Sequence, residues 1–564
     1  MHRTAKSTSP DIRDHVQLPT SAGHDGAQVL TPGALGFVVD LERRFARPRQ
    51  LLLAARAERA SQLAAGGRLD FPPASSPARA DTSWRVPAPA PDLIDRRVEI
   101  ATPPLNERRA SLALWSGAQV WVADLEDALS PTWANVLRGH AVLRAAAVGE
   151  LSVGPPVLPA DQEAAIVVRP RGWHQEERHV TIDGAPVSAS LFDFGLYFFH
   201  CARGRLKAGS GPYFYLPKLE GAADAALWND VFDYAEDVLG LDRGIIRSTV
   251  LIEDVAAAFE TEEILRALGP HAAGLTAGRW DYLFSYVRAF RTRPDRVLPD
   301  RQTVTMTAPF LHAYTEVLID SCHRRGAHAI GGVSAVLPDR HDPRTTARAV
   351  AAVLSDKRRE AAEGFDGAWV VHPDLVEPCR RAFDEVLSGR PHQIGLLGTR
   401  PEPDAQALVR LDGTGGRRTL AGLHSNIAVC VRYLDRWLRG QGTASIGGLM
   451  EGAATVEIAR SQIWQWIRHA VVLEDGTQVT RALAAEILQA ECARLAAERD
   501  AADGGGVHPQ GAPGALSEAR RLVQEIALCE DYPDFMTTPG YDALLALEDR
   551  ASALAPGQPP EPKR

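Results

Sequence analysis

Acidic residues at two points near the middle of the chain have the types and spacing of a divalent-cation site. Glu253 and Asp254 follow the apolar pair Leu251 and Ile252, and Asp281 lies 28 residues after Glu253 (281 − 253). Two carboxylates from neighbouring strands, completed by water and substrate oxygens, are a ligand set that Mg²⁺ favours. On spacing alone, the alternative is that these are solvated acids at the starts of loops.

An arginine stands in a similar position after another apolar run. Arg169 follows Ala-Ile-Val-Val and precedes Pro170, so it leaves a predicted buried strand at its carboxyl end. A guanidinium stays charged and can stabilise a developing oxyanion without donating its proton. Arg169 could instead pair with Asp124 or Glu126, and both roles are compatible.

The elements that must position these residues form a repeating pattern between residues 96 and 376. Eight short β-rich runs alternate with helical stretches, at 119–124, 165–169, 213–218, 248–253, 272–276, 303–307, 327–331 and 367–372. Parallel strands need crossover helices and are buried on both faces. Eight such units predict an α/β protein with a TIM (β/α)₈ barrel.

Nearly every predicted strand ends in a reactive or conformationally special residue. These residues are Asp124 with Glu126 and Asp127, Arg169, Lys218, Glu253, Arg279 with Asp281, Thr307, Gly331 with Gly332, and His372. A barrel gathers the carboxyl ends of its strands at one mouth, where active sites lie. The simpler alternative is that polar residues merely terminate the strands.

The rest of the chain divides by composition. We predict a disordered tail at 1–25, an N-terminal helical segment with a Pro-rich connector at 26–95, and the barrel at 96–395. A C-terminal helical domain follows at 396–555, and a second disordered tail at 556–564. Proline-rich stretches are expected to lie extended, and helical spacing of apolar residues indicates helices.

Composition narrows the class of function. The chain has 564 residues with a net charge of −9, so we expect small-molecule chemistry with no nucleic-acid partner and no membrane partner. The six cysteines form no CxxC pair, and no signal peptide or apolar span of about 20 residues is evident. We therefore predict a cytoplasmic protein, while the sequence leaves its oligomeric state open.

A set of motifs resembles malate synthase of the short, A-type isoform over about residues 30–550, and their number and order make the likeness specific. In chain order they are Val98-Glu99-Ile100, Ala123-Asp124-Leu125-Glu126-Asp127, Ser130-Pro131-Thr132-Trp133, Arg169-Pro170-Arg171-Gly172-Trp173-His174, Phe192-Asp193-Phe194-Gly195, Leu251-Ile252-Glu253, Phe259-Glu260, Gly278-Arg279-Trp280-Asp281, Cys322-His323, Gly331-Gly332, Asp366-Gly367-Ala368-Trp369 and Glu457-Ile458.

The resemblance implies an N-terminal helical clasp, a TIM barrel and a C-terminal helical plug at its mouth. It implies Mg²⁺-dependent condensation of acetyl-CoA with glyoxylate and then hydrolysis of malyl-CoA to malate and CoA, the reaction of the glyoxylate cycle. By position it assigns Glu253 and Asp281 as the Mg²⁺ ligands and Arg169 as the group that stabilises the enolate and aldehyde oxygens. It assigns the backbone of Gly278, Arg279, Trp280 and Asp281 to binding of the glyoxylate carboxylate, and Trp369 and Pro373 to the wall along acetyl-CoA. Asp124, Glu126 and Asp127 are assigned as supporting residues of the site.

One departure from the family concerns the catalytic base. The family motif Met-Glu-Asp-Ala-Ala-Thr reads Met450-Glu451-Gly452-Ala453-Ala454-Thr455 here, so glycine stands where the aspartate is expected. A general base contributes about 10²–10⁴ in rate. Successive helical residues point about 100° apart, so Glu451 could substitute only if the flexible Gly452 let the helix start rewind.

Other departures, including Leu112, Thr276, Ala277 and Val333, fall near the predicted mouth. They keep two alternatives open beside malate synthase activity. One is a related Mg²⁺-dependent acyl-CoA carbon–carbon lyase or condensing enzyme that acts on another 2-oxo acid. The other is a non-catalytic paralogue that binds CoA.

Overall fold

The computed structural model describes residues 15–19, 23–151, 163–396, 404–502 and 514–554. Its centre is a closed barrel of eight parallel strands, in the order β10-β11-β2-β3-β4-β7-β8-β9. The strands are β2 (Val98–Thr102), β3 (Val120–Asp124), β4 (Ala165–Arg169), β7 (Tyr213–Leu216), β8 (Arg247–Ile252), β9 (Ala272–Ala277), β10 (His328–Ser334) and β11 (Gly367–Val370). The predicted TIM barrel is confirmed.

Seven of the eight predicted strands are present, and the prediction at 303–307 was wrong. That stretch follows a 3₁₀ turn, η7 (Arg301–Thr303), in which the Thr303 amide donates to the Asp300 carbonyl oxygen. The missing strand is β2, which contains the charged residue Glu99. Glu99 is fully buried, and Arg96 compensates its charge at 2.7 Å from the carboxylate. The strand was missed because a charged residue is not expected inside a buried strand.

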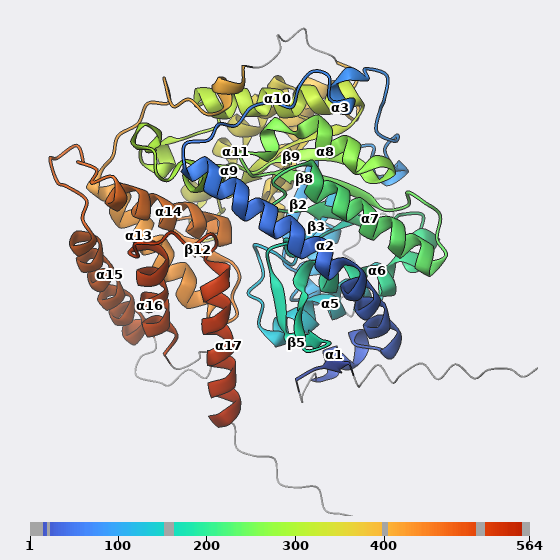
Figure 1. Cartoon of the computed structure of the whole chain (residues 1–564), viewed down its shortest axis with the longest axis horizontal. Coiled ribbons are helices and arrows are strands. Elements are labelled where there is room, and N and C mark those ends of the chain that lie inside the picture. The colour runs from blue at the N-terminus through green and yellow to red at the C-terminus, as the bar shows by residue number, and fades with distance from the viewer. Residues whose placement is uncertain (1–14, 20–22, 152–162, 397–403, 503–513, 555–564) are drawn as a thin grey trace, which may run out of the picture.

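Helices cover the outside of the barrel (Figure 1). They are α4 (Glu107–Leu114), α5 (Trp133–Ala147), α6 (Ala189–Lys207), α7 (Ala222–Leu239), α8 (Thr261–Ala267), α9 (Arg279–Phe290), α10 (Pro309–Arg325), α11 (Pro343–Glu363) and α12 (Val376–Leu387). A small antiparallel sheet joins β1 (Val16–Gln17), β5 (Glu176–Ile182) and β6 (Ala185–Ser188). The sequence did not lead us to expect this sheet.

The N-terminal helices lie against the barrel's outer layer. After α1 (Gly23–Val29), the long helix α2 (Pro32–Ala64) crosses α6 and α7 (Figure 1), and the short α3 (Pro77–Ala80) lies in the connector. Thr31 caps α2, since its hydroxyl accepts from the Ala34 amide. Within the tail predicted at 1–25, β1 and the start of α1 are ordered elements, while 1–14 and 20–22 lie outside the described residues.

The C-terminal residues form helices around a core of their own. These are α13 (Leu420–Trp437), α14 (Ala453–Arg468), α15 (Arg481–Ala502), α16 (Ala515–Ala527) and α17 (Thr537–Leu554), with a hairpin of β12 (Ala444–Ile446) and β13 (Leu449–Glu451). Helix α14 packs along α9, next to the barrel mouth. Residues 556–564, predicted as a tail, lie outside the described part.

All six cysteines are free thiols in the structure. No helix within the described residues has the length and apolarity needed to cross a bilayer.

A partly buried histidine on β5 joins the C-terminal helix α17 to the small antiparallel sheet, and its ion pairs predict a pH-dependent stability. His179 Nδ1 lies 2.7 Å from Glu177 Oε1, and Nε2 lies 2.8 Å from Glu548 Oε2 on α17. Burial opposes protonation, but these two carboxylates raise the pKa of His179 to about 9. The imidazolium therefore stabilises the fold fully below the unfolded pKa of about 6.5, and this contribution is lost as pH rises through about 9.

We expect the thermal midpoint of wild type to fall between pH 7 and 10 more steeply than that of His179→Gln. Unfolding followed by circular dichroism at closely spaced pH values measures both slopes. Equal slopes for the two proteins would show that His179 is not responsible for the pH dependence of the thermal midpoint.

Candidate active site

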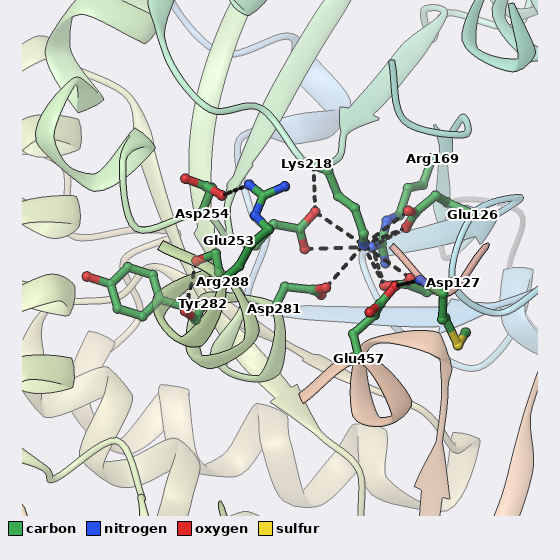
Figure 2. A network of polar contacts seen from close by, with 12 residues as sticks. Glu126, Asp127, Arg169, Lys218, Glu253, Asp254, Asp281, Tyr282, Arg288 and Glu457 are labelled. Atoms are coloured by element: carbon green, nitrogen blue, oxygen red, sulfur yellow. Dashed lines mark hydrogen bonds and ion pairs between the residues drawn. The ribbon is translucent and has the colours of Figure 1, made fainter. Parts of the chain in front are cut away.

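Five carboxylates and two cations meet at the mouth formed by the carboxyl ends of the strands. Figure 2 labels all of them except Asp124. Asp124 ends β3 and Arg169 ends β4, while Glu253 comes directly after β8. Lys218 lies two residues beyond β7, and Asp281 lies in the first turn of α9. Glu126 and Asp127 extend from the loop after β3 and complete the cluster. The sequence thus predicted the convergence of these strand ends, but it wrongly included Thr307, because 303–307 forms no strand.

Arg169 binds the carboxylates that follow β3. Its Nη2 donates to Glu126 Oε2 at 2.7 Å and to Asp127 Oδ2 at 2.6 Å, and lies 3.7 Å from Glu253 Oε2. Its Nη1 lies 3.5 Å from Asp124 Oδ2. Arg169 is only 4% exposed, so its guanidinium faces the interior of the mouth and not solvent. Pairing with Asp124 and Glu126, which the sequence left as an alternative, occurs.

The negative charge of the cluster exceeds its positive charge. If all five carboxylates ionise, two cations leave a net charge of −3 (2 − 5) in a nearly solvent-free site. Burial raises the pKa of Glu253 and of Asp281, and it raises the pKa of Glu126 to about 8. A buried charge imbalance of this kind is relieved by protonation or by a divalent cation.

The geometry shows which oxygens are available to a cation. Asp127, Glu253 and Asp281 each offer one oxygen within 4.8 Å of the others. Both Asp127 oxygens contact cations, Oδ2 at 2.6 Å from Arg169 and Oδ1 at 3.2 Å from Lys218. Among the described residues, Asp281 Oδ1 is buried without a hydrogen-bond partner, and the cation nearest to Glu253 Oε2 is Arg169 Nη2 at 3.7 Å. These two carboxylates therefore fit the ligand set of Mg²⁺ best, because its shell is completed by waters and substrate.

Gly278 permits the close approach of β8 and α9. A Cβ at this position would lie 2.9 Å from Glu253 Cβ, closer than side chains tolerate. The Gly278 amide donates to Tyr314 Oη at 3.1 Å, and Tyr314 in turn donates to the Ile252 carbonyl oxygen. The backbones that carry Glu253 and Asp281 are thereby locked together.

We expect Gly278→Ala to weaken Mg²⁺ binding about tenfold or more, because the added methyl pushes the Glu253 side chain from its place. Titration calorimetry with MgCl₂ measures the change. Gly395→Ala is the control, since open space surrounds that glycine. Unchanged affinity in Gly278→Ala would contradict the close-approach explanation.

The remaining predicted residues lie around this cluster. The Trp369 ring lies 6.0 Å from Arg169 Cζ and packs edge-on against Tyr215, so it forms a floor inside the barrel. Pro373 follows β11 on the rim and is partly exposed. Arg279 stacks on Trp280 at 3.9 Å, at the start of α9.

Gly452 lies at the mouth, between β13 and α14. It is the N-cap of α14 with φ −121° and ψ −172°, an extended conformation open to any residue. A Cβ here would meet only the Asp127 carbonyl oxygen, at 3.7 Å. Glu451 ends β13, is 2% exposed, and places Oε1 3.9 Å from Arg301. The start of α14 is therefore not rewound, and Glu451 faces Arg301.

Residues that sequence reasoning left without a role also line this region. A cavity of about 260 Å³ between the barrel and the C-terminal helices is lined by Asp127, Lys218, His174, Glu457 and Phe535, among others. His174 stacks on Phe535 at 3.9 Å, and burial lowers its pKa well below 6.5, so it is neutral. The Arg-Gly-Trp-His run was visible, but nothing in it indicated that the histidine faces a cavity.

The comparisons with known proteins agree with the fold. Family models match residues 14–76 (malate synthase, N-terminal domain), 165–410 (malate synthase, TIM barrel domain) and 417–544 (malate synthase, C-terminal). Malate synthase of Streptomyces clavuligerus is 50% identical, covering 92% of this chain and 96% of that protein. Malate synthase of Myxococcus xanthus is 46% identical (93% and 95%), and malate synthase A of Escherichia coli is 40% identical (94% and 98%). The chain therefore belongs to the malate synthase family.

Proposed function

We propose that this chain condenses acetyl-CoA with glyoxylate and hydrolyses the resulting thioester to malate and CoA. Membership of the malate synthase family supports the reaction. The observation that carries it is the meeting of Glu253 and Asp281 with Arg169 at one buried mouth. The unpaired cysteines support a reducing compartment, the cytoplasm.

Glu253 and Asp281 are the residues that we expect to hold Mg²⁺. Their carboxylates meet at a site with excess negative charge, which a divalent cation would relieve. When bound, Mg²⁺ supplies Lewis-acid polarisation of the aldehyde carbonyl of glyoxylate.

The start of α9 is suited to the carboxylate of a 2-oxo acid. The first-turn N–H groups of Arg279, Trp280 and Asp281 have no acceptor within the helix, and the helix dipole favours an anion there. Because Asp281 is also a proposed metal ligand, glyoxylate bound here is positioned beside the cation. This arrangement supports the assignment of the backbone of Gly278–Asp281 to glyoxylate.

Arg169 is placed to stabilise the negative charge that forms during condensation. Loss of a proton from the acetyl methyl group gives an enolate, whose carbon attacks the aldehyde carbon and forms the new carbon–carbon bond. The resulting alkoxide takes up a proton to give malyl-CoA, and water then cleaves the carbon–sulfur bond. A fixed guanidinium in a buried site lowers the energy of these oxyanions more than it could in water. We propose that Trp369 and Pro373 form the wall along the thioester.

The proton acceptor is the part that this chain has altered. Gly452 has no side chain to accept the methyl proton, and the Glu451 carboxylate faces Arg301. Glu451 would have to leave Arg301 to reach a substrate at the mouth. We therefore propose that condensation is slow in this chain, with Glu451 as the substitute base.

The test is the Mg²⁺-dependent release of free CoA thiol from acetyl-CoA and glyoxylate, with malate identified by mass spectrometry. We expect both products with Mg²⁺ and neither after chelation. Pyruvate and oxaloacetate serve as substitute 2-oxo acids, to detect a related condensing enzyme. Binding of acetyl-CoA without turnover of any acceptor would contradict the proposal and favour a non-catalytic paralogue.

A further inference from the structure

We infer that Lys218 is a positioning residue for the metal site, which orients the carboxylates of Glu253 and Asp281 for the cation through contacts with one oxygen of each. The inference deepens the proposed function and rests on it. Lys218 was noted in the sequence only as a residue at a strand end.

Two donors of Lys218 act on the same oxygen of Glu253. The Lys218 amide donates to Glu253 Oε1 at 2.7 Å, and Lys218 Nζ lies 3.8 Å from that same oxygen. The other oxygen, Oε2, is left facing the mouth, where its nearest cation is Arg169 at 3.7 Å. The orientation of this carboxylate is thus set from one side only.

The ammonium also contacts the other carboxylates of the cluster (Figure 2). Nζ lies 3.2 Å from Asp281 Oδ1, 3.2 Å from Asp127 Oδ1 and 3.1 Å from Glu126 Oε1. Asp281 therefore has Oδ1 beside the ammonium, as Glu253 has Oε1, and the two carboxyl groups also lie close to each other. An ammonium is a compact point charge with three donors, so it can serve several carboxylates that converge from different strands.

The backbone of Lys218 has a conformation that its side chain does not favour. Its φ is +53°, in the left-handed region, where residues with a Cβ are uncommon. Strain of this kind persists where the surrounding structure demands a particular geometry. Here the turn after β7 directs both the amide and the side chain of Lys218 at the cluster.

The Lys218 ammonium should stabilise the metal-free protein but weaken its affinity for the metal. Without metal, it offsets part of the net charge of the five carboxylates and stabilises the fold. With metal, it is a like charge a few ångströms from the cation, so it weakens metal binding while it orients the ligands. A residue that only fills space would show neither effect.

The experiment compares wild type with Lys218→Met, which keeps the length of the side chain and removes its charge. We expect the melting temperature of the metal-free variant to fall and saturating Mg²⁺ to restore most of the loss. We expect the Mg²⁺ dissociation constant, measured by calorimetry, to decrease about tenfold or more, because the like charge is gone. Binding of Mn²⁺ followed by electron paramagnetic resonance should show a broader, less ordered signal in the variant.

Lys357→Met is the matched control, because Lys357 is also a fully buried lysine, paired with Glu360 at 2.9 Å outside the cluster. We expect it to lower stability without any change in Mg²⁺ affinity. Alkylation of Lys218→Cys with 2-bromoethylamine rebuilds an ammonium at the same place and should restore the wild-type Mg²⁺ affinity, relative to wild type treated identically.

Unchanged Mg²⁺ affinity in Lys218→Met, or a loss of stability that Mg²⁺ does not relieve, would overturn this inference alone. Failure of wild type itself to bind Mg²⁺ would overturn the proposed function, and this inference with it.

Discussion

The Gly452→Asp variant is expected to condense acetyl-CoA with glyoxylate about 10²–10⁴ times faster than wild type, because it supplies a general base. Position 452 has room for the side chain, since a Cβ there meets only the Asp127 carbonyl oxygen at 3.7 Å. The backbone needs no change, as φ is −121°. Aspartate is also a preferred N-cap, so α14 should be stabilised slightly. The rate of CoA thiol release at saturating substrates is the measurement.

Two further variants separate the base from the cap. Gly452→Asn offers the same shape and a good N-cap without a basic carboxylate, so we expect it to match wild type in rate. Glu451→Gln in the wild-type background should remove the residual rate if Glu451 takes the proton. No gain in Gly452→Asp, or an equal gain in Gly452→Asn, would rule out a missing base as the defect.

Replacement of Arg169 by glutamine is expected to lower kcat/KM for the condensation by about 10²–10³ or more, because the group that stabilises the oxyanions is lost. The change also removes the shortest ion pairs of Glu126 and Asp127, at 2.7 and 2.6 Å, and leaves Lys218 as their remaining cation, so stability should fall as well. The measurement is the steady-state rate of CoA release. It is best made in the Gly452→Asp background, because the higher starting rate expected there makes a loss easier to measure than in wild type.

Arg169→Lys distinguishes charge from geometry. It keeps one positive charge but cannot reach Glu126, Asp127 and the substrate oxygen together, so we expect an intermediate rate. If Arg169→Gln retained near-wild-type kcat/KM while remaining folded, the guanidinium would have no part in the chemistry.

The barrel and the identity of its mouth residues could be predicted from the sequence because strand ends are marked locally. The run Ala-Ile-Val-Val before Arg169 and the pair Leu251 and Ile252 before Glu253 are short, apolar and followed by a charge. Closure of a parallel barrel then brings such residues together whatever the connecting loops do.

Other features depend on contacts distant in sequence. Strand β2 was missed because Glu99 is paired with Arg96 and accepts a hydrogen bond from the Tyr215 hydroxyl inside the barrel, which no local pattern reveals. The 303–307 stretch is rich in β-branched residues, yet a turn bonded to Asp300 precedes it. The hairpin of β5 and β6 did carry a local signal, the pair Asp183-Gly184, both with positive φ, a typical two-residue hairpin turn.

The role of Lys218 could not be predicted, since it depends on a left-handed backbone and on carboxylates that follow β3, follow β8 and begin α9. Likewise, the sequence shows that Gly452 lacks a side chain, but only the structure shows that Glu451 faces Arg301. Local patterns identified the groups at the mouth, and the directions of their side chains came from packing.

The most direct test is a calorimetric titration of Mg²⁺ into wild type, Glu253→Gln and Asp281→Asn in the presence of glyoxylate. We expect one Mg²⁺ per chain in wild type and a loss of affinity of at least about 100-fold in each variant, because each removes a ligand. Asp254→Asn is the control, since Asp254 pairs with Arg288 at 2.7 Å and should leave the affinity unchanged. Equal Mg²⁺ binding by wild type and both ligand variants, or no binding by wild type, would contradict a metal site formed by Glu253 and Asp281.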